Sequence, residues 1–207
     1  MLVKALMLPR EQLVIAGSDE SLESALKKIE DNNFLSIPVA DGKVFIGSIS
    51  KQKIFEEYFK GSYNDKQSYL EDTKIKDIFG GIIPRIDPND PIERASRVLE
   101  NFGIPFVAVV NEKDNFEGII THYAIFHAFG EVFGINEGRR ISVIVDDIPG
   151  QLAKLTDIIT KAGGDIISIA VIDPKVKLGL KEIVVRVRII NFNDLIEKIE
   201  DAGFKFQ

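Results

Sequence analysis

Two stretches of the chain show the same succession of apolar and polar positions. The first is NNFLSIPVADGKVFIGSIS, read from Asn32, and the second is FGIPFVAVVNEKDNFEGIIT, read from Phe102. Each has a polar or glycine break, an apolar run, a polar turn, a second apolar run and a closing hydroxyl residue. The pattern predicts a strand, a hairpin turn and a returning strand in both places.

The two stretches are related by a nearly constant spacing along the chain. Val39 corresponds to Val109 before the turn, and Gly47 corresponds to Gly118 after it, so the spacing grows by a single position between them. The additional residue falls in the second hairpin turn, where an insertion disturbs the fold least. The chain therefore contains an internal repeat.

Amphipathic helices flank each hairpin. The spacing of Leu22, Ala25, Leu26 and Ile29 predicts a helix over residues 20–31. In each repeat a second helix is expected after the returning strand. Residues 60–73 lose this periodicity and gain polar turn formers, so we expect a surface connection between the repeats there. The remaining predicted elements are a helix over 51–59, a helix that begins near Asp87–Pro91, and a closing helix that carries Ile125, Phe126 and Phe129.

A different pattern follows the second repeat. It predicts the order β-α-β-β-α-β, which is the ferredoxin-like arrangement. The strand over 181–190 alternates clearly, with Ile183, Val185, Val187 and Ile189 on one side, so one of its faces is expected to be buried. The fold class is therefore α+β, with two β-α-β-β-α repeats and a βαββαβ domain. The other predicted elements are strands over 141–145, 166–172 and 204–206, helices from Leu152 to Ala162 and from Asn193 to Ala202, and a loop over 173–179.

Composition narrows the class of protein. The chain has 207 residues, no cysteine and a net charge of −6 without a basic block, which argues against disulfides, thiolate metal sites and nucleic-acid binding. No apolar run approaches the length of roughly 18 residues that a membrane-spanning helix needs. The N-terminal apolar run is too short for a secretory signal. We expect a soluble cytoplasmic protein that does not enter a membrane.

The repeat motifs resemble the CBS family. The residues that carry the resemblance are Asp19–Leu22 and Asn89–Ile92 at the helix starts, Ile37–Val39 with its turn, and the closing segments 47–50 and 118–121. Two such repeats in tandem resemble a Bateman module. The predicted boundaries are 1–66 for the first CBS repeat, 67–136 for the second and 137–207 for the last domain.

The last domain resembles the ACT family. The motif runs from Val145 through Pro149-Gly150 to Ala153, and is followed by Gly163–Ile166. The order of two CBS repeats and a terminal ACT domain is similar to the acetoin-utilisation (AcuB-like) group of bacterial proteins. The resemblance implies a regulatory protein that senses a ligand and is not itself an enzyme.

The CBS resemblance implies two clefts for an adenine nucleotide. In the family, the base lies against the first strand of one repeat, and a hydroxyl residue with a carboxylate three positions later in the other repeat holds the ribose. Small alanines would leave room for the base. One cleft would use Ala25, Phe34, Leu35 and Ser36 with Ile120 and Thr121, and the other would use Ala95, Ile104, Pro105 and Phe106 with Ser50 and Lys53.

The expected ribose carboxylates are missing from this sequence. Lys53 and Ala124 stand at those two positions. Lysine favours phosphate oxygens, so we expect recognition through base and phosphate, with a cyclic dinucleotide such as cyclic di-AMP or a polyphosphorylated nucleotide favoured over AMP. The alternative is that Lys51 and Lys53 form a solvated helix face and that Phe34 and Phe106 close the clefts.

The ACT resemblance implies a site for an amino acid or another small effector. Asp147, Ile148, Pro149, Gly150 and Gln151 precede a helix whose free N–H groups can bind a carboxylate, and Gly164 and Asp165 begin the next strand. The alternative is structural: Pro149-Gly150 starts this helix and Gly163-Gly164 ends it.

Neither a metal site nor a catalytic constellation is expected. His122 and His127 are five residues apart, which is about 140° around a helix, so they do not face one metal ion. We predict a regulatory homodimer that binds a small ligand and no cofactor. The alternative function is an interaction module that binds no nucleotide and regulates a partner enzyme in acetoin or central carbon metabolism.

Overall fold

The computed structural model describes residues 1–63, 65–78, 84–173 and 179–207. These residues form two compact units, Met1–Phe126 and His127–Gln207. Residues 174–178 of the loop predicted over 173–179 lie outside the described residues. In the described part of the chain, no helix is long and apolar enough to cross a membrane. The mixed α+β fold class predicted from the sequence is confirmed.

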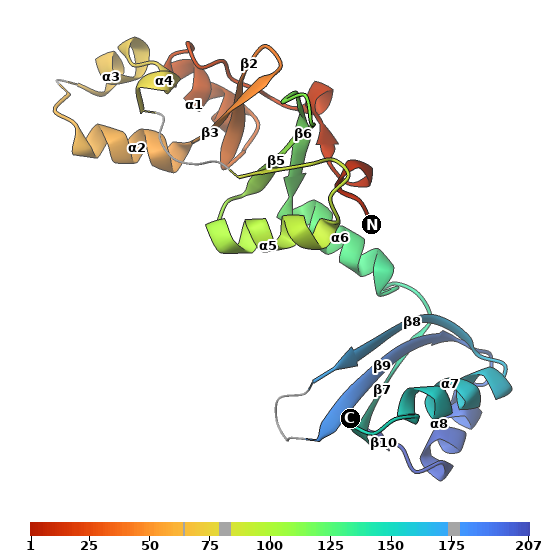
Figure 1. Cartoon of the computed structure of the whole chain (residues 1–207). Coiled ribbons are helices and arrows are strands. Elements are labelled where there is room, and N and C mark those ends of the chain that lie inside the picture. Colours follow the sequence, from red (N-terminus) through yellow and green to blue (C-terminus); the bar gives the residue numbers. More distant parts are fainter. Residues whose placement is uncertain (64, 79–83, 174–178) are drawn as a thin grey trace. The chain divides into compact units, whose positions relative to one another are not determined.

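The first unit contains the two repeats, each with a helix, a β-hairpin and a closing helix (Figure 1). Their first helices correspond, because α1 begins at Leu22 and α5 at Ile92. The elements of this unit and the helix that continues from it are η1 (Val3–Ala5), β1 (Leu8–Pro9), η2 (Arg10–Gln12), α1 (Leu22–Asp31), β2 (Ser36–Asp41), β3 (Val44–Ser50), α2 (Lys51–Lys60), α3 (Lys66–Asp72), α4 (Ile75–Ile78), β4 (Arg85–Ile86), α5 (Ile92–Phe102), β5 (Phe106–Val110), β6 (Phe116–Thr121) and α6 (His122–Val132).

The short segments that precede the repeats are exchanged between them. The Lys4 amide donates to the Pro88 carbonyl at 2.8 Å, and the Lys76 amide donates to the Ser18 carbonyl at 3.0 Å. These two hydrogen bonds correspond to each other in the two repeats, because Ser18 and Pro88 occupy matching positions. Each repeat therefore depends on the opening segment of the other for backbone hydrogen bonds.

The sheets of the first unit also follow the repeat. One sheet has the order β1-β6-β5-β4, and β2 pairs with β3 in a second sheet. Parallel pairing joins Ile86 to Val109, and a parallel bridge joins Ala16 to Val39 at the equivalent place. The predicted hairpins are thus present in both repeats.

Aromatic packing joins the two hairpins. The Phe45 and Phe116 rings lie with their centroids 5.0 Å apart, within a buried cluster drawn from both repeats. The Phe116 amide donates to the Lys43 carbonyl at 2.8 Å, and Arg85 Nη2 donates to the Phe45 carbonyl at 2.9 Å. Burial of this apolar surface stabilises the repeats as one body.

The prediction of a surface connection over residues 60–73 is wrong for the second half of that segment. Residues Lys66–Asp72 form α3, which Asp65 caps by accepting a hydrogen bond from the Ser68 amide at 2.9 Å. Tyr69 and Leu70 are buried in the core of the first repeat. The helix has only seven residues, which is too short for a clear apolar period, and its stability comes from this packing.

The second unit is built on one four-stranded antiparallel sheet of order β10-β7-β9-β8. Ile183, Val185 and Val187 point into its core, as the alternation predicts. Helices α7 and α8 lie together on one side of the sheet (Figure 1). Its elements are β7 (Arg139–Asp146), α7 (Gln151–Lys161), β8 (Asp165–Ile172), β9 (Leu180–Arg188), α8 (Phe192–Asp201) and β10 (Lys205–Phe206).

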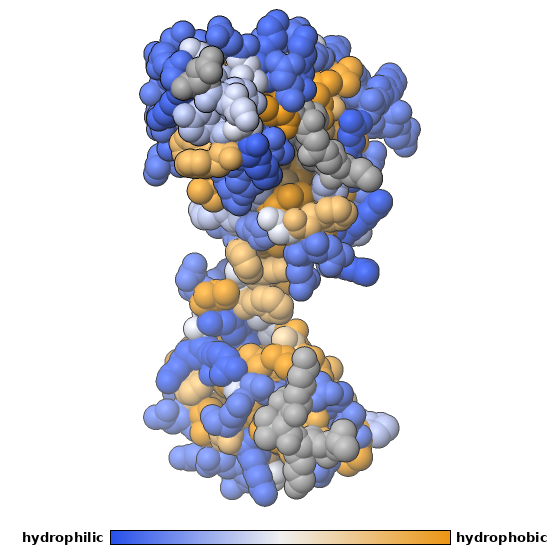
Figure 2. All heavy atoms as spheres, turned by 90° about the vertical axis from the view of Figure 1, so that its left-hand side faces the viewer, coloured by the Kyte–Doolittle hydropathy of each residue, from blue (hydrophilic) through white to orange (hydrophobic). Residues whose placement is uncertain are grey.

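Hydrophobic side chains also reach the surface. Figure 2 shows them scattered among hydrophilic residues on the face in view. Leu35 is 79% exposed, and Val171 on β8 is 53% exposed. Apolar side chains that are scattered singly in this way are normal on the surface of a folded protein.

Candidate functional site

A cavity of about 380 Å³ lies between the two repeats in the first unit. It brings together the segment between α1 and β2, the start of β5, the end of β6 and the chain around β1. Its lining is mainly apolar, which is typical of sites for small organic ligands. The lining residues are Leu8, Gln12, Leu13, Val14, Asn33, Phe34, Leu35, Ser36, Ile37, Pro38, Pro105, Phe106, Ile119 and Thr121.

Equivalent helix ends place both repeats at this cavity. Asn33 and Gly103, which occupy matching positions in the two repeats, both adopt a left-handed backbone, with φ of 53° and 58°. This conformation ends a helix and turns the chain into the next strand. After the first turn, Phe34 and Leu35 reach the cavity, and after the second, Pro105 does so.

Two hydroxyl groups supply polar contacts at the cavity. Thr121 Oγ1 accepts a hydrogen bond from the Ala124 amide at 3.2 Å and so caps α6. Ser36 Oγ is buried and has no hydrogen-bond partner among the described residues. A buried hydroxyl without a partner is uncommon and is expected to meet a ligand or water.

The structure brings together predicted residues that the sequence had assigned to two separate clefts. Phe34, Leu35 and Ser36 share one cavity with Pro105 and Phe106, and Thr121 lines it too. Half-buried Ile104 is not part of this lining. The assignment of these residues to a nucleotide stays a prediction.

The small residues Ala25 and Ala95 lie elsewhere. Both are completely buried, and so is Ile120. Ala25 packs in the core of the first repeat and does not line the cavity. The space for a ligand therefore comes from the loop ends and not from these small side chains.

Ser50 and Lys53 are engaged within helix α2. Ser50 Oγ accepts a hydrogen bond from the Lys53 amide at 3.1 Å. Lys53 Nζ donates to Glu57 at 2.9 Å, and Lys51 Nζ lies 3.0 Å from Glu30. The hydrogen bonds from Lys53 and from Lys60 lower the pKa of Glu57. None of these residues lines the cavity.

The sequence reasoning missed the N-terminal side of the cavity. Leu8 pairs with Ile119 across β1 and β6, and both residues line the cavity. A Cβ atom at Gly118 would clash with the Leu8 carbonyl, so glycine permits this close approach. The matching glycines of the two repeats were the available signal, but pairing over such a separation cannot be read from periodicity.

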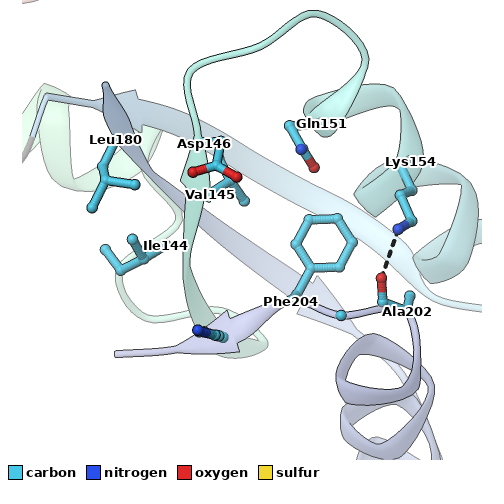
Figure 3. Close-up of a pocket in the computed structure, with 10 residues that line it drawn as sticks. Ile144, Val145, Asp146, Gln151, Lys154, Leu180, Ala202 and Phe204 are labelled. Atoms are coloured by element: carbon cyan, nitrogen blue, oxygen red, sulfur yellow. Dashed lines mark hydrogen bonds between the residues drawn. The ribbon is translucent and has the colours of Figure 1, made fainter. Parts of the chain in front are cut away.

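A second cavity, of about 350 Å³, lies in the second unit (Figure 3). Lys154 Nζ donates to the Ala202 carbonyl at 2.6 Å and lies 5.3 Å from the Phe204 ring centroid. Gln151 and the Phe204 ring reach the same hollow as Lys154 (Figure 3). The lining residues are Ile144, Val145, Asp146, Gln151, Lys154, Leu180, Ala202, Gly203, Phe204 and Lys205.

The predicted effector residues do not come together within one copy of the chain. Gln151 lines the second cavity, whereas Asp147, Ile148, Pro149 and Gly150 do not. Gly164 and Asp165 follow the other end of α7, whose eleven residues span roughly 16 Å.

Local contacts give these residues structural roles. Gly150 precedes α7 and has a φ of 94°. Asp147 Oδ2 lies 3.5 Å from Lys181 Nζ. Asp165 Oδ2 accepts a hydrogen bond from Arg188 at 2.9 Å. A Cβ atom at Gly164 would lie 2.8 Å from the Ile159 side chain, so this glycine permits close packing at the end of the helix. The effector site stays a prediction.

No group of three or more histidine, cysteine, aspartate or glutamate side chains arranged for a metal ion occurs in the described ranges of the chain. His127 faces Glu131 on the same helix, with 3.8 Å between Nδ1 and Oε1.

Solved structures resemble the first unit. A CBS domain-containing protein of unknown function from Bacillus anthracis str. Ames Ancestor is 28% identical, with a TM-score of 0.56 over 63% of this chain and 93% of that chain. A hypothetical conserved protein from Geobacillus kaustophilus is 25% identical, with a TM-score of 0.56 over 63% of this chain and 96% of that chain. CbpB in complex with c-di-AMP is 21% identical, with a TM-score of 0.55 over 63% of this chain and 85% of that chain. At this identity the likeness shows only that the two proteins share a fold.

Family comparisons cover nearly the whole chain. No match is found among curated proteins. The CBS domain model matches residues 3–60 and 75–131, and the ACT domain model matches residues 139–204. The chain therefore belongs to the CBS-domain family and carries two CBS domains in tandem, followed by a C-terminal ACT domain.

Proposed function

We propose that this protein is a ligand-sensing regulator that binds an adenine-type nucleotide, such as cyclic di-AMP, between its two CBS domains. The observation that carries the proposal is the cavity of about 380 Å³ that both repeats line. Its apolar walls fit a flat base, while Ser36 and Thr121 offer hydroxyl groups to the edge of the base or to the ribose.

Structures with the same fold support a nucleotide as the ligand class. CbpB was solved with c-di-AMP, CBSX2 with AMP, and the CBS domain of a bacterial CNNM/CorC Mg2+ transporter with ATP. CBS and ACT domains are regulatory modules, so no catalytic role is proposed for this chain.

Native mass spectrometry of the purified protein, followed by calorimetric titration with cyclic di-AMP, ATP and AMP, tests this function. We expect a retained nucleotide or a dissociation constant below about 1 mM for at least one of the three. Absence of binding by all three would contradict the proposal and favour the alternative, an interaction module that regulates a partner enzyme without a nucleotide.

A cavity-filling variant locates the binding. Leu13 lines the cavity and is half-buried, so Leu13→Trp is expected to fill it and weaken binding at least ~10-fold. Leu152→Trp is the matched control, because Leu152 lies on α7 in the ACT domain and is 39% exposed. Equal affinities in the two variants would place the nucleotide elsewhere.

We also propose an amino acid or another small effector for the ACT domain. The second cavity carries one acidic side chain, Asp146, and two basic ones, Lys154 and Lys205. This set matches the ammonium and carboxylate groups of a free amino acid. A calorimetric screen of the standard amino acids against wild type and Lys154→Met tests the site, and equal binding to both proteins would contradict it.

The homodimer that we propose is supported by strand β8. It is an edge strand of the ACT sheet, and residues 166–172 carry no charge. Ile169, Val171 and Ile172 are all exposed there. An edge that is uncharged over this stretch and exposes apolar side chains favours pairing with another strand, and a second copy provides one.

We further propose that the protein belongs to the acetoin-utilisation (AcuB-like) group and regulates a partner enzyme in acetoin or central carbon metabolism. The order of two CBS domains and a terminal ACT domain supports this proposal. Deletion of the gene is then expected to slow growth on acetoin and not on glucose. Unchanged growth on acetoin would contradict this assignment while leaving the ligand-sensing proposal intact.

A further inference from the structure

The side chains that line the cavity between the CBS domains carry no charge. Among the described residues of its lining, the polar side chains are Gln12, Asn33, Ser36 and Thr121, and neither a lysine nor an arginine is present. A phosphate placed inside would lose its hydration without gaining a cation, which is strongly unfavourable.

Arg10 and Lys53, two cations that a phosphate could recruit, have partners of their own. Arg10, which lies between lining residues Leu8 and Gln12, donates to the Gly42 carbonyl, and its guanidinium lies 6.0 Å from the Phe116 ring centroid. Lys53 is paired with Glu57 at 2.9 Å. Both cations are therefore held in contacts with groups that do not line the cavity.

Uncharged hydrogen-bonding groups are available instead. Ser36 Oγ is buried without a partner among the described residues, and the Thr121 hydroxyl, which accepts from the Ala124 amide, still has a proton to donate. A ligand that satisfies Ser36 Oγ removes an unfavourable feature of the free protein, so this hydroxyl discriminates between ligands.

We propose that the cavity selects the uncharged part of its ligand, an adenine-type nucleoside, and that the phosphate groups remain in solvent and contribute little to affinity. This inference rests on the proposed nucleotide-binding function. It replaces recognition of base and phosphate, expected from Lys53, with recognition of base and ribose. A cyclic dinucleotide then binds through its nucleoside portion.

Calorimetric titration of the full chain with adenosine, AMP and cyclic di-AMP tests the inference, at low salt and again at about 0.5 M NaCl. We expect the adenosine and AMP dissociation constants to agree within about threefold and the AMP constant to change less than about twofold with salt. AMP binding that is ~10-fold tighter than adenosine binding would overturn the inference and leave the nucleotide function standing. Absence of binding by all three ligands would overturn the function and the inference together.

A pair of serine variants tests the role of Ser36. Ser36→Ala is expected to weaken adenosine binding at least ~5-fold, because it removes the hydroxyl that the ligand satisfies. Ser48→Ala is the matched control, since Ser48 lies opposite Pro38 on the neighbouring strand and does not line the cavity. Equal adenosine affinities for the two variants, both with unchanged circular dichroism, would overturn the assignment of Ser36.

Discussion

Ser36 and Ser50 lie directly opposite each other across strands β2 and β3, yet their hydroxyl groups have different surroundings. Ser50 Oγ accepts a hydrogen bond from the Lys53 amide and caps α2, whereas Ser36 Oγ is buried without a partner among the described residues. The Ser50 hydroxyl therefore stabilises the fold, whereas the Ser36 hydroxyl is the group that the proposed ligand would satisfy.

This difference predicts opposite effects on stability in the ligand-free protein. Ser36→Ala removes an unsatisfied buried hydroxyl and is expected to raise the free energy of unfolding of the CBS unit by about 1 kcal/mol. Ser50→Ala removes a helix cap and is expected to lower it by about 1 kcal/mol.

Urea denaturation followed by tyrosine fluorescence measures both changes. All four tyrosines, at positions 58, 63, 69 and 123, lie within Met1–Phe126, so the signal reports on the CBS unit alone. A loss of stability in Ser36→Ala comparable to that in Ser50→Ala would show that the Ser36 hydroxyl is already satisfied in the free protein.

Gly118 is expected to be essential for the pairing of β1 with β6. A Cβ atom at this position would clash with the Leu8 carbonyl, so Gly118→Ala is expected to destabilise the CBS unit by roughly 1–3 kcal/mol and to weaken nucleotide binding. Gly17→Ala is the control, because the nearest atom to its Cβ lies 3.7 Å away. Equal denaturation midpoints for the two variants would refute this role for Gly118.

The raised pKa of Tyr69 predicts a loss of stability at high pH. Burial, with smaller contributions from Tyr63 and Glu57, raises the pKa of Tyr69 from 10.0 to about 12. The folded state therefore retains this proton more firmly than the unfolded state does. The resulting stability is fully present below about pH 10 and is lost as pH rises toward 12.

The variant Tyr69→Phe tests this assignment. It removes the hydrogen bond that the hydroxyl donates to the Ile54 carbonyl at 2.8 Å, and it is expected to cost about 1 kcal/mol at neutral pH. Its stability should fall less steeply than that of wild type between pH 10 and 12. Parallel pH profiles for the two proteins would exclude Tyr69 as the titrating group.

The exposed edge of the ACT sheet predicts a charge-sensitive dimer. Val171→Lys places a charge on β8 and is expected to shift the protein from dimer to monomer in light scattering. Val44→Lys is the control, because Val44 is 44% exposed in the CBS unit. A dimer that persists in Val171→Lys would exclude β8 as the interface.

The hydrophobic pattern was sufficient to predict the repeat and the β-α-β-β-α-β order of the last domain. Local signals determine these features: the left-handed turns at Asn33 and Gly103 follow α1 and α5, and the alternation of Ile183, Val185 and Val187 matches their burial. The hairpins follow in the same way, because their strands and turns are adjacent in sequence.

Features that depend on distant contacts could not be predicted. The α3 helix is short and gains its stability when Tyr69 and Leu70 enter the core of the first repeat. The Leu8 side of the cavity depends on pairing with Ile119, which lies in the other repeat and far away in sequence. Likewise, the partner of Lys53 depends on the rotamer that places its ammonium group beside Glu57.

Methyl NMR of the isoleucine-labelled full chain during titration with adenosine and AMP shows directly whether the cavity between the CBS domains holds the uncharged part of a nucleotide. Ile37 and Ile119 line this cavity, whereas Ile159 lies in the ACT core. We expect both ligands to shift the Ile37 and Ile119 signals alike and to leave the Ile159 signal unchanged. Shifts that require the phosphate, or that leave Ile37 and Ile119 unaffected, would contradict this proposal.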